Sequence, residues 1–177
     1  LTDHATVPVT EQFVATGGAV PLTFTATGLP TGLTMDSSGR VTGTPSQAGT
    51  FSVTIIATDA RELVGTAGFT WTIIALPQIV LPIPQTSFVG VAVNLAIAKT
   101  GGAAPFTWSA AGLPAGLTIN PSTGVISGTP TAAVAAATVT LTLTDGLGAI
   151  ATGSFLWTVA PPTPPVPNNP GQQGGTV

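Results

Sequence analysis

The sequence contains no cysteine and very little charge. Without cysteine, the chain can form neither disulfide bonds nor thiolate metal sites. Charged residues make up only 5% of the chain, whereas roughly 25% is typical of globular proteins. Apart from one histidine, the cations are Arg40, Arg61 and Lys99. Three cations are too few to neutralise a phosphate backbone, so the sequence excludes nucleic acid as a partner.

The sequence also lacks a long hydrophobic run, although 44% of its residues are hydrophobic. A membrane-spanning helix needs about 18 or more uninterrupted apolar residues. Residues 132–143 alternate with threonine, and residues 73–83 are interrupted by Pro77 and Pro82. We therefore expect no transmembrane segment. No signal peptide is visible and the chain starts at Leu1, which we interpret as the start of a processed or excised product.

A long internal repeat is the most informative feature that is present. Residues 28–35 (GLPTGLTM) return as residues 112–119 (GLPAGLTI), and the Gly-Thr-Pro at residues 43–45 returns at residues 128–130. The offset of 84 grows to 86 at the pair Trp71 and Trp157, which indicates small insertions in loops. A repeat of this length is a tandem array of whole domains. We predict a first domain over residues 1–75, a second over 76–160, and an extended proline-rich tail over 161–177.

Within each repeat the hydrophobic pattern has a period of two. Residues 51–58 and their counterparts 137–144 alternate apolar and hydroxyl side chains, which is typical of half-buried strands. Turn-forming residues separate several such segments, and no segment shows a helical stripe. The pattern predicts an all-β fold with one β-sandwich in each repeat. Trp71, Trp108 and Trp157 fall in the inward register, so we expect them in the core and not in a sugar-stacking platform.

Two compound motifs carry a resemblance to a known family. The order G-L-P-x-G-L, a turn, G-T-P and a strand ending in aspartate occurs over residues 28–59 and again over 112–145. In this order the chain resembles a family of tandem immunoglobulin-like repeats that is similar to the cadherin-like domain of dystroglycan. The resemblance covers about 160 of the 177 residues. It implies two tandem immunoglobulin-like β-sandwiches in extracellular or cell-surface proteins that adhere, space or assemble. It implies no active site.

The residues that could carry chemistry are few and scattered. His4 is the only histidine and lies near the terminus, so we expect a solvated residue and not an oriented catalytic base. Asp59 and Asp145 occupy equivalent turn positions, where aspartate commonly accepts hydrogen bonds from the backbone. No loop offers the oxygen ligands of a calcium site, and the junction at residues 75–78 has no carboxylate. We expect no catalytic residue, no metal and no cofactor, and hence no enzyme.

The two repeats differ at their N-terminal ends. Residues 78–84 predict a first strand for the second domain, and their prolines suit a sheet edge. Shifted by 84 residues, the equivalent of this strand falls at or before Leu1. We therefore expect the first domain to lack its first strand, and another molecule to cover the sheet edge near Val7, Val9 and Phe13.

The proline-rich tail is a candidate donor for this missing strand. Residues 160–167 can be aligned with residues 75–82, which places Val166 and Pro167 over Leu81 and Pro82. Donation of the tail to a neighbouring copy would be β-strand addition, and its head-to-tail repetition would give a filament. The alternative is that the tail forms a stiff polyproline spacer.

The scarcity of charge favours association. A surface of threonine, serine, alanine and glycine lacks the repulsion that keeps proteins monomeric, and the mean hydropathy is +0.54. The leading hypothesis is a non-enzymatic extracellular structural or assembly module that contacts other copies of itself in a filament or surface layer. The alternative is an adhesin-type module at the cell surface that recognises a carbohydrate or a protein receptor.

Overall fold

The computed structural model describes residues 1–162, which form sixteen strands and no helix. The N-terminal domain contains β1 (Thr2–His4), β2 (Val9–Gln12), β3 (Thr23–Thr27), β4 (Leu33–Met35), β5 (Arg40–Gly43), β6 (Gly49–Thr58) and β7 (Val64–Ile74). The C-terminal domain contains β8 (Gln78–Val80), β9 (Gln85–Phe88), β10 (Val93–Ala96), β11 (Ala98–Thr100), β12 (Thr107–Ala111), β13 (Leu117–Ile119), β14 (Val125–Gly128), β15 (Val134–Thr144) and β16 (Ile150–Ala160). Beyond residue 162, the predicted tail, with Val166 and Pro167, lies outside the described residues.

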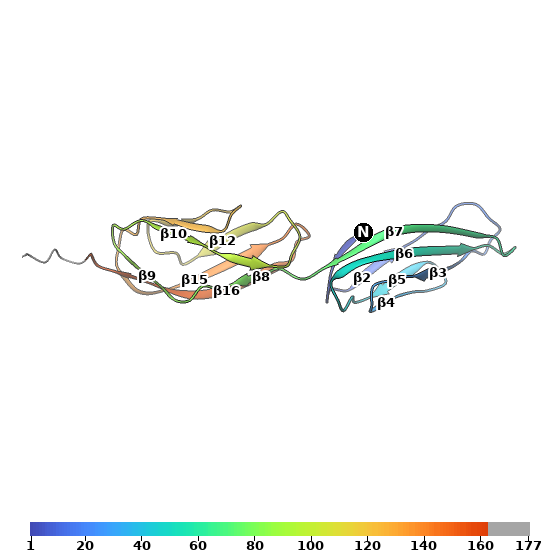
Figure 1. Ribbon diagram of the computed structural model, residues 1–177, viewed down its shortest axis with the longest axis horizontal. Coiled ribbons are helices and arrows are strands. Elements are labelled where there is room, and N and C mark those ends of the chain that lie inside the picture. The colour runs from blue at the N-terminus through green and yellow to red at the C-terminus, as the bar shows by residue number, and fades with distance from the viewer. Residues whose placement is uncertain (163–177) are drawn as a thin grey trace, which may run out of the picture.

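Each domain is a sandwich of two main sheets, and the two domains lie end to end (Figure 1). In the N-terminal domain the sheets have the strand orders β1-β7-β6-β3 and β2-β5-β4. The corresponding sheets of the C-terminal domain are β9-β16-β15-β12 and β10-β14-β13, and β8 pairs with β11 as an additional two-stranded ribbon. The predicted all-β fold of two tandem immunoglobulin-like sandwiches is confirmed. Within residues 1–162, no helix could cross a membrane.

A long antiparallel hairpin organises the core of each domain. β6 pairs with β7 from Gly49 opposite Ile73 to Thr58 opposite Val64, and β15 pairs with β16 in the same way. Their inward side chains meet the opposite sheet, because successive side chains of a strand alternate between its faces. The exposed fraction is 0% for Trp71, 1% for Trp157 and 3% for Trp108. The tryptophans therefore belong to the cores, as their register predicts.

The repeated Gly-Leu-Pro motif has a steric cause. Gly28 and Gly112 both have φ of 74°, a conformation that favours glycine because it has no Cβ. A Cβ on Gly28 would lie 2.1 Å from the carbonyl oxygen of Ser52, and one on Gly112 would lie 2.2 Å from that of Thr138. The turn therefore passes so close to the central strand that only glycine fits.

The start of the C-terminal domain differs from the predicted single strand over residues 78–84. β8 ends at Val80 and β9 begins only at Gln85. Pro82 and Pro84 lie between them and have no amide to donate to a ladder. β9 then pairs in parallel with β16, with Thr86 opposite Thr158, just as β1 pairs with β7, with Thr2 opposite Thr72. β1 is therefore the counterpart of β9, and not of β8.

Candidate functional site at the domain junction

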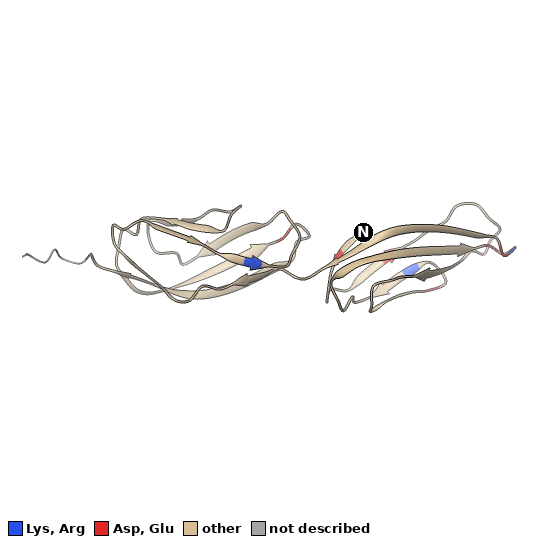
Figure 2. Cartoon of the chain, viewed as in Figure 1, with Lys and Arg blue, Asp and Glu red and all other residues tan. Residues whose placement is uncertain are grey.

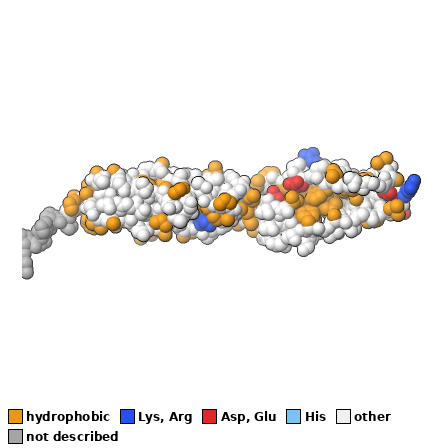
Figure 3. Space-filling model, turned by 90° about the horizontal axis from the view of Figure 1, so that it is seen from above, with side chains coloured by type: hydrophobic (Ala, Val, Ile, Leu, Met, Phe, Trp, Pro, Cys, Tyr) orange, Lys and Arg blue, Asp and Glu red, His pale blue; other side chains and the backbone are white. Residues whose placement is uncertain are grey.

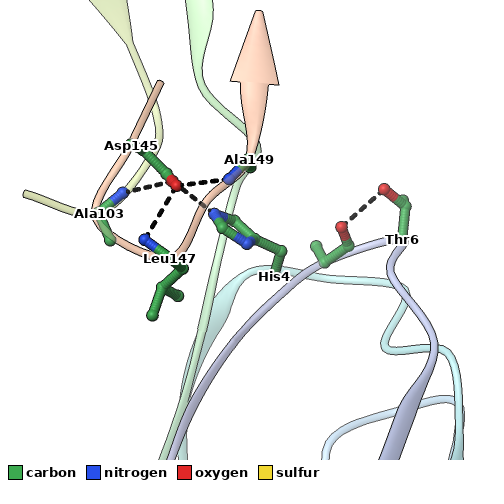
Figure 4. A network of polar contacts seen from close by, with 7 residues as sticks. His4, Thr6, Ala103, Asp145, Leu147 and Ala149 are labelled. Carbon is green, nitrogen blue, oxygen red and sulfur yellow. Dashed lines mark hydrogen bonds and ion pairs between the residues drawn. The ribbon is translucent and has the colours of Figure 1, made fainter. Parts of the chain in front are cut away.

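The one histidine of the chain lies buried between the two domains. His4 has an exposed fraction of 6%, and its Nε2 lies 2.6 Å from Oδ2 of Asp145 in the C-terminal domain (Figure 4). The expectation that His4 is a solvated terminal residue is wrong. β1 runs parallel to β7, the strand that leads into the next domain, so the end of β1 faces the junction.

Two contacts hold β1 in the position that presents His4. The indole Nε1 of Trp71 donates a hydrogen bond of 2.7 Å to Oδ2 of Asp3. The backbone amide of Ala5, directly after His4, donates to the carbonyl of Ile74 over 2.8 Å. Because Trp71 is wholly buried, its indole is a fixed donor. His4 is thus placed by the core of its own domain.

On the other side of the junction, hydrogen bonds also fix the position of the Asp145 side chain. Its Oδ1 accepts hydrogen bonds from the backbone amides of Leu147 and Ala149, and its Oδ2 accepts one from Ala103. His4 is the fourth partner. The carboxylate therefore closes its own β15–β16 turn and joins the neighbouring loop to it.

Asp59 has the same set of backbone partners in the N-terminal domain. Its Oδ1 accepts from the amides of Arg61 and Leu63, and its Oδ2 accepts from that of Ala19. The prediction that Asp59 and Asp145 cap equivalent turns is confirmed. The difference is that Asp145 also receives a side chain from the neighbouring domain.

The environment keeps Asp145 ionised. Burial raises the pKa of the Asp145 carboxyl, but the hydrogen bonds from Ala103, Ala149 and His4 outweigh this effect and hold the pKa below its ordinary value. A carboxylate that accepts several backbone amides prefers its charged form. The contact with His4 is consequently a charge-assisted hydrogen bond, and it becomes an ion pair when the imidazole is protonated.

The arrangement positions the domains and offers no reactive centre. The other three partners of Asp145 are backbone amides, so no nucleophile belongs to the pair. Within residues 1–162, no group of three histidine, cysteine or acidic side chains could hold a metal ion. Figure 2 shows how thinly the charged residues are spread along the two domains. What this site can do chemically is fix the orientation of one module on the next.

The described residues that were predicted for assembly differ in how far they are exposed. Val7 is 40% exposed, whereas Val9 lies in β2 and is 6% exposed. Phe13 stacks on Phe69, with 5.5 Å between the ring centroids. Val9 thus belongs to the core of the N-terminal domain, and Phe13 is partly buried against that core.

One feature of the sequence points to the junction. Asp145 has an equivalent, Asp59, at the same place in the first repeat, which indicates a turn. The only histidine of the chain has no equivalent histidine in the second repeat. By the offset of 84 residues, His4 corresponds to Phe88. A unique imidazole in a chain almost without charge is a candidate for a specific polar contact. Its partner 141 residues away follows only from the three-dimensional arrangement.

Comparison with known proteins assigns the fold to a family. The family model described as "Putative Ig domain" matches residues 3–74 and again residues 77–160. The chain belongs to this immunoglobulin-like family. The two matches lie on either side of the junction that His4 and Asp145 bridge.

One set of relatives matches most of this chain within a far longer protein. Over 148 residues the chain is 35% identical to the "Serine-rich adhesin for platelets" of Staphylococcus aureus strain MRSA252. That match covers 80% of this chain and 11% of the relative; in the same adhesin of strain MW2 it covers 6%. The chain therefore spans a small part of the curated relatives that it matches.

Solved structures of extracellular domains are similar to this chain. Extracellular domains 3–5 of Drosophila OTK superimpose with a TM-score of 0.55 at 14% identity, over 90% of this chain and 59% of that one. A C-terminal fragment of intimin in complex with its receptor's binding domain gives a TM-score of 0.49 at 19% identity, over 75% of this chain and 50% of that one.

Proposed function

We propose that the chain is a non-enzymatic segment of an extracellular, cell-surface adhesin, in which two immunoglobulin-like modules form one extended unit that recognises a surface carbohydrate or protein. The relationship to the staphylococcal adhesin supports the class of protein. The buried contact between His4 and Asp145 is the structural observation that carries the proposal.

A restrained junction would fix the orientation in which the two modules meet a partner. Neighbouring domains move relative to each other by default unless their interface is held. Here the hydrogen-bonded pair of His4 and Asp145 is buried at the junction, and only three residues separate the end of β7 from the start of β8. Bending at the junction would separate His4 from Asp145. This separation costs free energy, because a buried polar group that loses its hydrogen-bond partner is unfavourable. An extended unit of fixed shape suits a protein that reaches from one surface to another.

A filament subunit is the second candidate, and the exposed apolar side chains favour it. Val14 and Val20 are each 82% exposed, and Leu63 is 67% exposed. All three lie in or beside the end loops of the N-terminal domain. Large exposed apolar side chains mark a surface for interaction, and in this second candidate they would contact another copy of the chain.

Adhesion separates the two candidates directly. Beads that carry the chain, attached through its C-terminus, should bind cells or an arrayed glycan or protein in a saturable manner, and soluble chain should compete. Beads that carry the C-terminal domain alone serve as the comparison. Beads that bind nothing, together with fibres of the soluble chain in electron micrographs, would contradict the adhesin proposal and favour the filament subunit.

A further inference from the structure

The buried pair at the junction uses only one of the two ring nitrogens of His4. Nε2 lies 2.6 Å from Oδ2 of Asp145. Within residues 1–162, Nδ1 has no hydrogen-bond partner, and no buried side-chain nitrogen or oxygen lacks one. Nδ1 therefore reaches solvent, and Figure 4 shows the second ring nitrogen on the side away from the carboxylate. His4 thus has one nitrogen inside the junction and one at its surface.

The contact also determines which ring nitrogen carries the proton. The carboxyl of Asp145 is ionised near neutral pH, because its pKa is below the ordinary value. An ionised carboxylate can only accept hydrogen bonds, so the proton between the two groups belongs to Nε2 of His4. The neutral imidazole then has its lone pair on Nδ1. A second proton from water enters at Nδ1 and leaves the bond from Nε2 to Oδ2 in place.

Few other charges act on this pair. Within residues 1–162, the ion pair of His4 is with Asp145 alone. Asp3, the neighbour of His4 on β1, accepts a hydrogen bond from the indole of Trp71. Histidine is the side chain whose ordinary titration falls between pH 5 and pH 8. In this range the imidazole is therefore the group at the junction that changes its charge.

The elements around the pair bring one further charge, which is a cation. Nζ of Lys99 in β11 lies 3.3 Å from the centroid of the Phe106 ring. β7, the linker over residues 75–77, the loop over residues 101–106 and the turn over residues 146–149 contain no ionisable side chain. Figure 3 shows how widely the charged side chains are spaced on the face that is seen from above. No nearby charge competes with the carboxylate for the imidazole.

Proton uptake should strengthen the contact. It places a positive charge directly opposite the carboxylate, and hydrogen bonds between two charged groups are the strongest kind. Burying a cation usually costs free energy. Here the cost is small, because Nε2 faces the carboxylate and Nδ1 remains in contact with water. The attraction to Asp145 therefore exceeds the loss of hydration.

We propose that the junction is an acid-strengthened clamp, in which proton uptake by His4 between pH 8 and pH 5 tightens its bond to Asp145 and thereby the contact between the domains. The ligand of this site is the proton itself. The proposal rests on the geometry of the junction and is independent of the adhesin assignment.

The clamp has a lower limit in acid. The ordinary pKa of an aspartate carboxyl is about 3.9, and that of Asp145 is lower in the folded chain. The contact is consequently lost as the pH falls from about 3.9 through the folded pKa. We expect the junction to be tightest in mild acid and looser both at pH 8 and in strong acid.

The ring nitrogens of His4 report the protonation site directly. The chain has one histidine, so its ¹⁵N signals need no assignment, provided that no histidine tag is present. At pH 8 the shifts should show a proton on Nε2 and a bare Nδ1, and at pH 5 they should show a proton on both. A proton on Nδ1 and a bare Nε2 at pH 8 would overturn the proposal.

Hydrogen exchange measures the tightening, and the first domain supplies an internal control. The amide of Ala103 donates to the same oxygen of Asp145 that His4 contacts, and the amide of Ala19 donates to Asp59, which has no histidine partner. Relative to the intrinsic exchange rate at each pH, protection of Ala103 should be at least about threefold higher at pH 5 than at pH 8. Protection of Ala19 should stay constant.

The His4→Gln variant separates the charge from the hydrogen bond. Its side-chain amide can still donate to Asp145 but does not titrate, so protection of Ala103 should be the same at pH 5 and pH 8. The same rise in His4→Gln as in the natural chain, or no rise in the natural chain, would overturn the proposal. If the variant does not fold, as its melting curve reports, the ring-nitrogen shifts and the comparison with Ala19 decide. No ligand is used, so a negative result leaves the adhesin proposal intact.

Discussion

At the residue scale, two equivalent aspartates differ in one partner. Asp59 and Asp145 accept the same three kinds of backbone amide, and only Asp145 also accepts His4 across the junction. A substitution at Asp59 therefore serves as a matched control for one at Asp145. The difference between the two variants isolates the contribution of the interdomain contact.

The Asp145→Asn variant should loosen the junction, and Asp59→Asn should not. In both variants a carboxamide replaces the carboxylate, and its NH₂ group takes the place of one acceptor oxygen. Each turn therefore loses one hydrogen-bond acceptor. In Asp145→Asn the charge-assisted bond to His4 is lost as well, at a cost of roughly 1–3 kcal/mol. Small-angle scattering should show a broader range of interdomain angles for Asp145→Asn alone. Equal scattering from the two variants would mean that His4 does not restrain the domains.

The aspartates also determine how the chain responds to acid. A hydrogen bond from the Ser38 hydroxyl lowers the pKa of Asp36, and backbone hydrogen bonds from Ala19 and Leu63 lower that of Asp59. The pKa of Asp145 is lowered as well. A carboxyl whose pKa is lower in the folded state than in the unfolded state stabilises the fold above the unfolded value, about 3.9. This stability is lost as the pH falls from about 3.9 through the folded pKa.

Thermal melting as a function of pH checks this expectation. The melting temperature should be nearly constant from neutral pH to about pH 5 and should fall steeply below about pH 4. Asp145→Asn should melt at a lower temperature at neutral pH and should show a smaller loss on acidification, since its amide does not titrate. A variant that keeps the full acid sensitivity of the natural chain would show that Asp145 does not contribute to it.

At the element scale, β1 connects the core of the N-terminal domain to the junction. Trp71 donates to Asp3 in β1, and Trp157 donates to Ser87 in the equivalent strand β9. Within residues 1–162, β1 ends in His4, which contacts the other domain. Asp3→Ala should therefore release β1 and, with it, the hold of His4 on Asp145. Ser87→Ala should disturb β9 and leave the junction unchanged.

Hydrogen exchange distinguishes these outcomes. In Asp3→Ala the amides of Ala5 and of Ala103, which donates to Asp145, should exchange faster than in the natural chain. In Ser87→Ala faster exchange should be confined to the neighbourhood of β9. Unchanged exchange at Ala103 in Asp3→Ala would contradict the connection through β1.

The long strands could be predicted from the sequence, and the short ones could not. Alternation over residues 51–58 and 137–144 extends over enough residues to identify β6 and β15. β1 has three residues, and its stability comes from parallel pairing with β7, which no local pattern reveals. The prediction of one strand over residues 78–84 failed because its prolines divide the segment. The burial of His4 cannot be predicted from the sequence either, because it depends on β1, which no local pattern reveals.

At the scale of the whole molecule, the repeat explains both what the domains share and where they differ. Each domain buries its own core, and each ends in a hairpin capped by aspartate. The C-terminal domain also accepts a hydrogen-bond partner, His4, from its neighbour. At the equivalent end of the N-terminal domain, Asp59 accepts hydrogen bonds from backbone amides of its own domain.

The central claim is that the junction holds the two modules as one unit, and residual dipolar couplings test it most directly. Amide couplings are measured in one aligned sample and fitted separately for residues 2–74 and 78–160. The structure predicts that both domains yield the same alignment tensor, in magnitude and orientation, when they are placed as in Figure 1. Tensors of clearly different magnitude for the two domains would show independent motion and would contradict the claim.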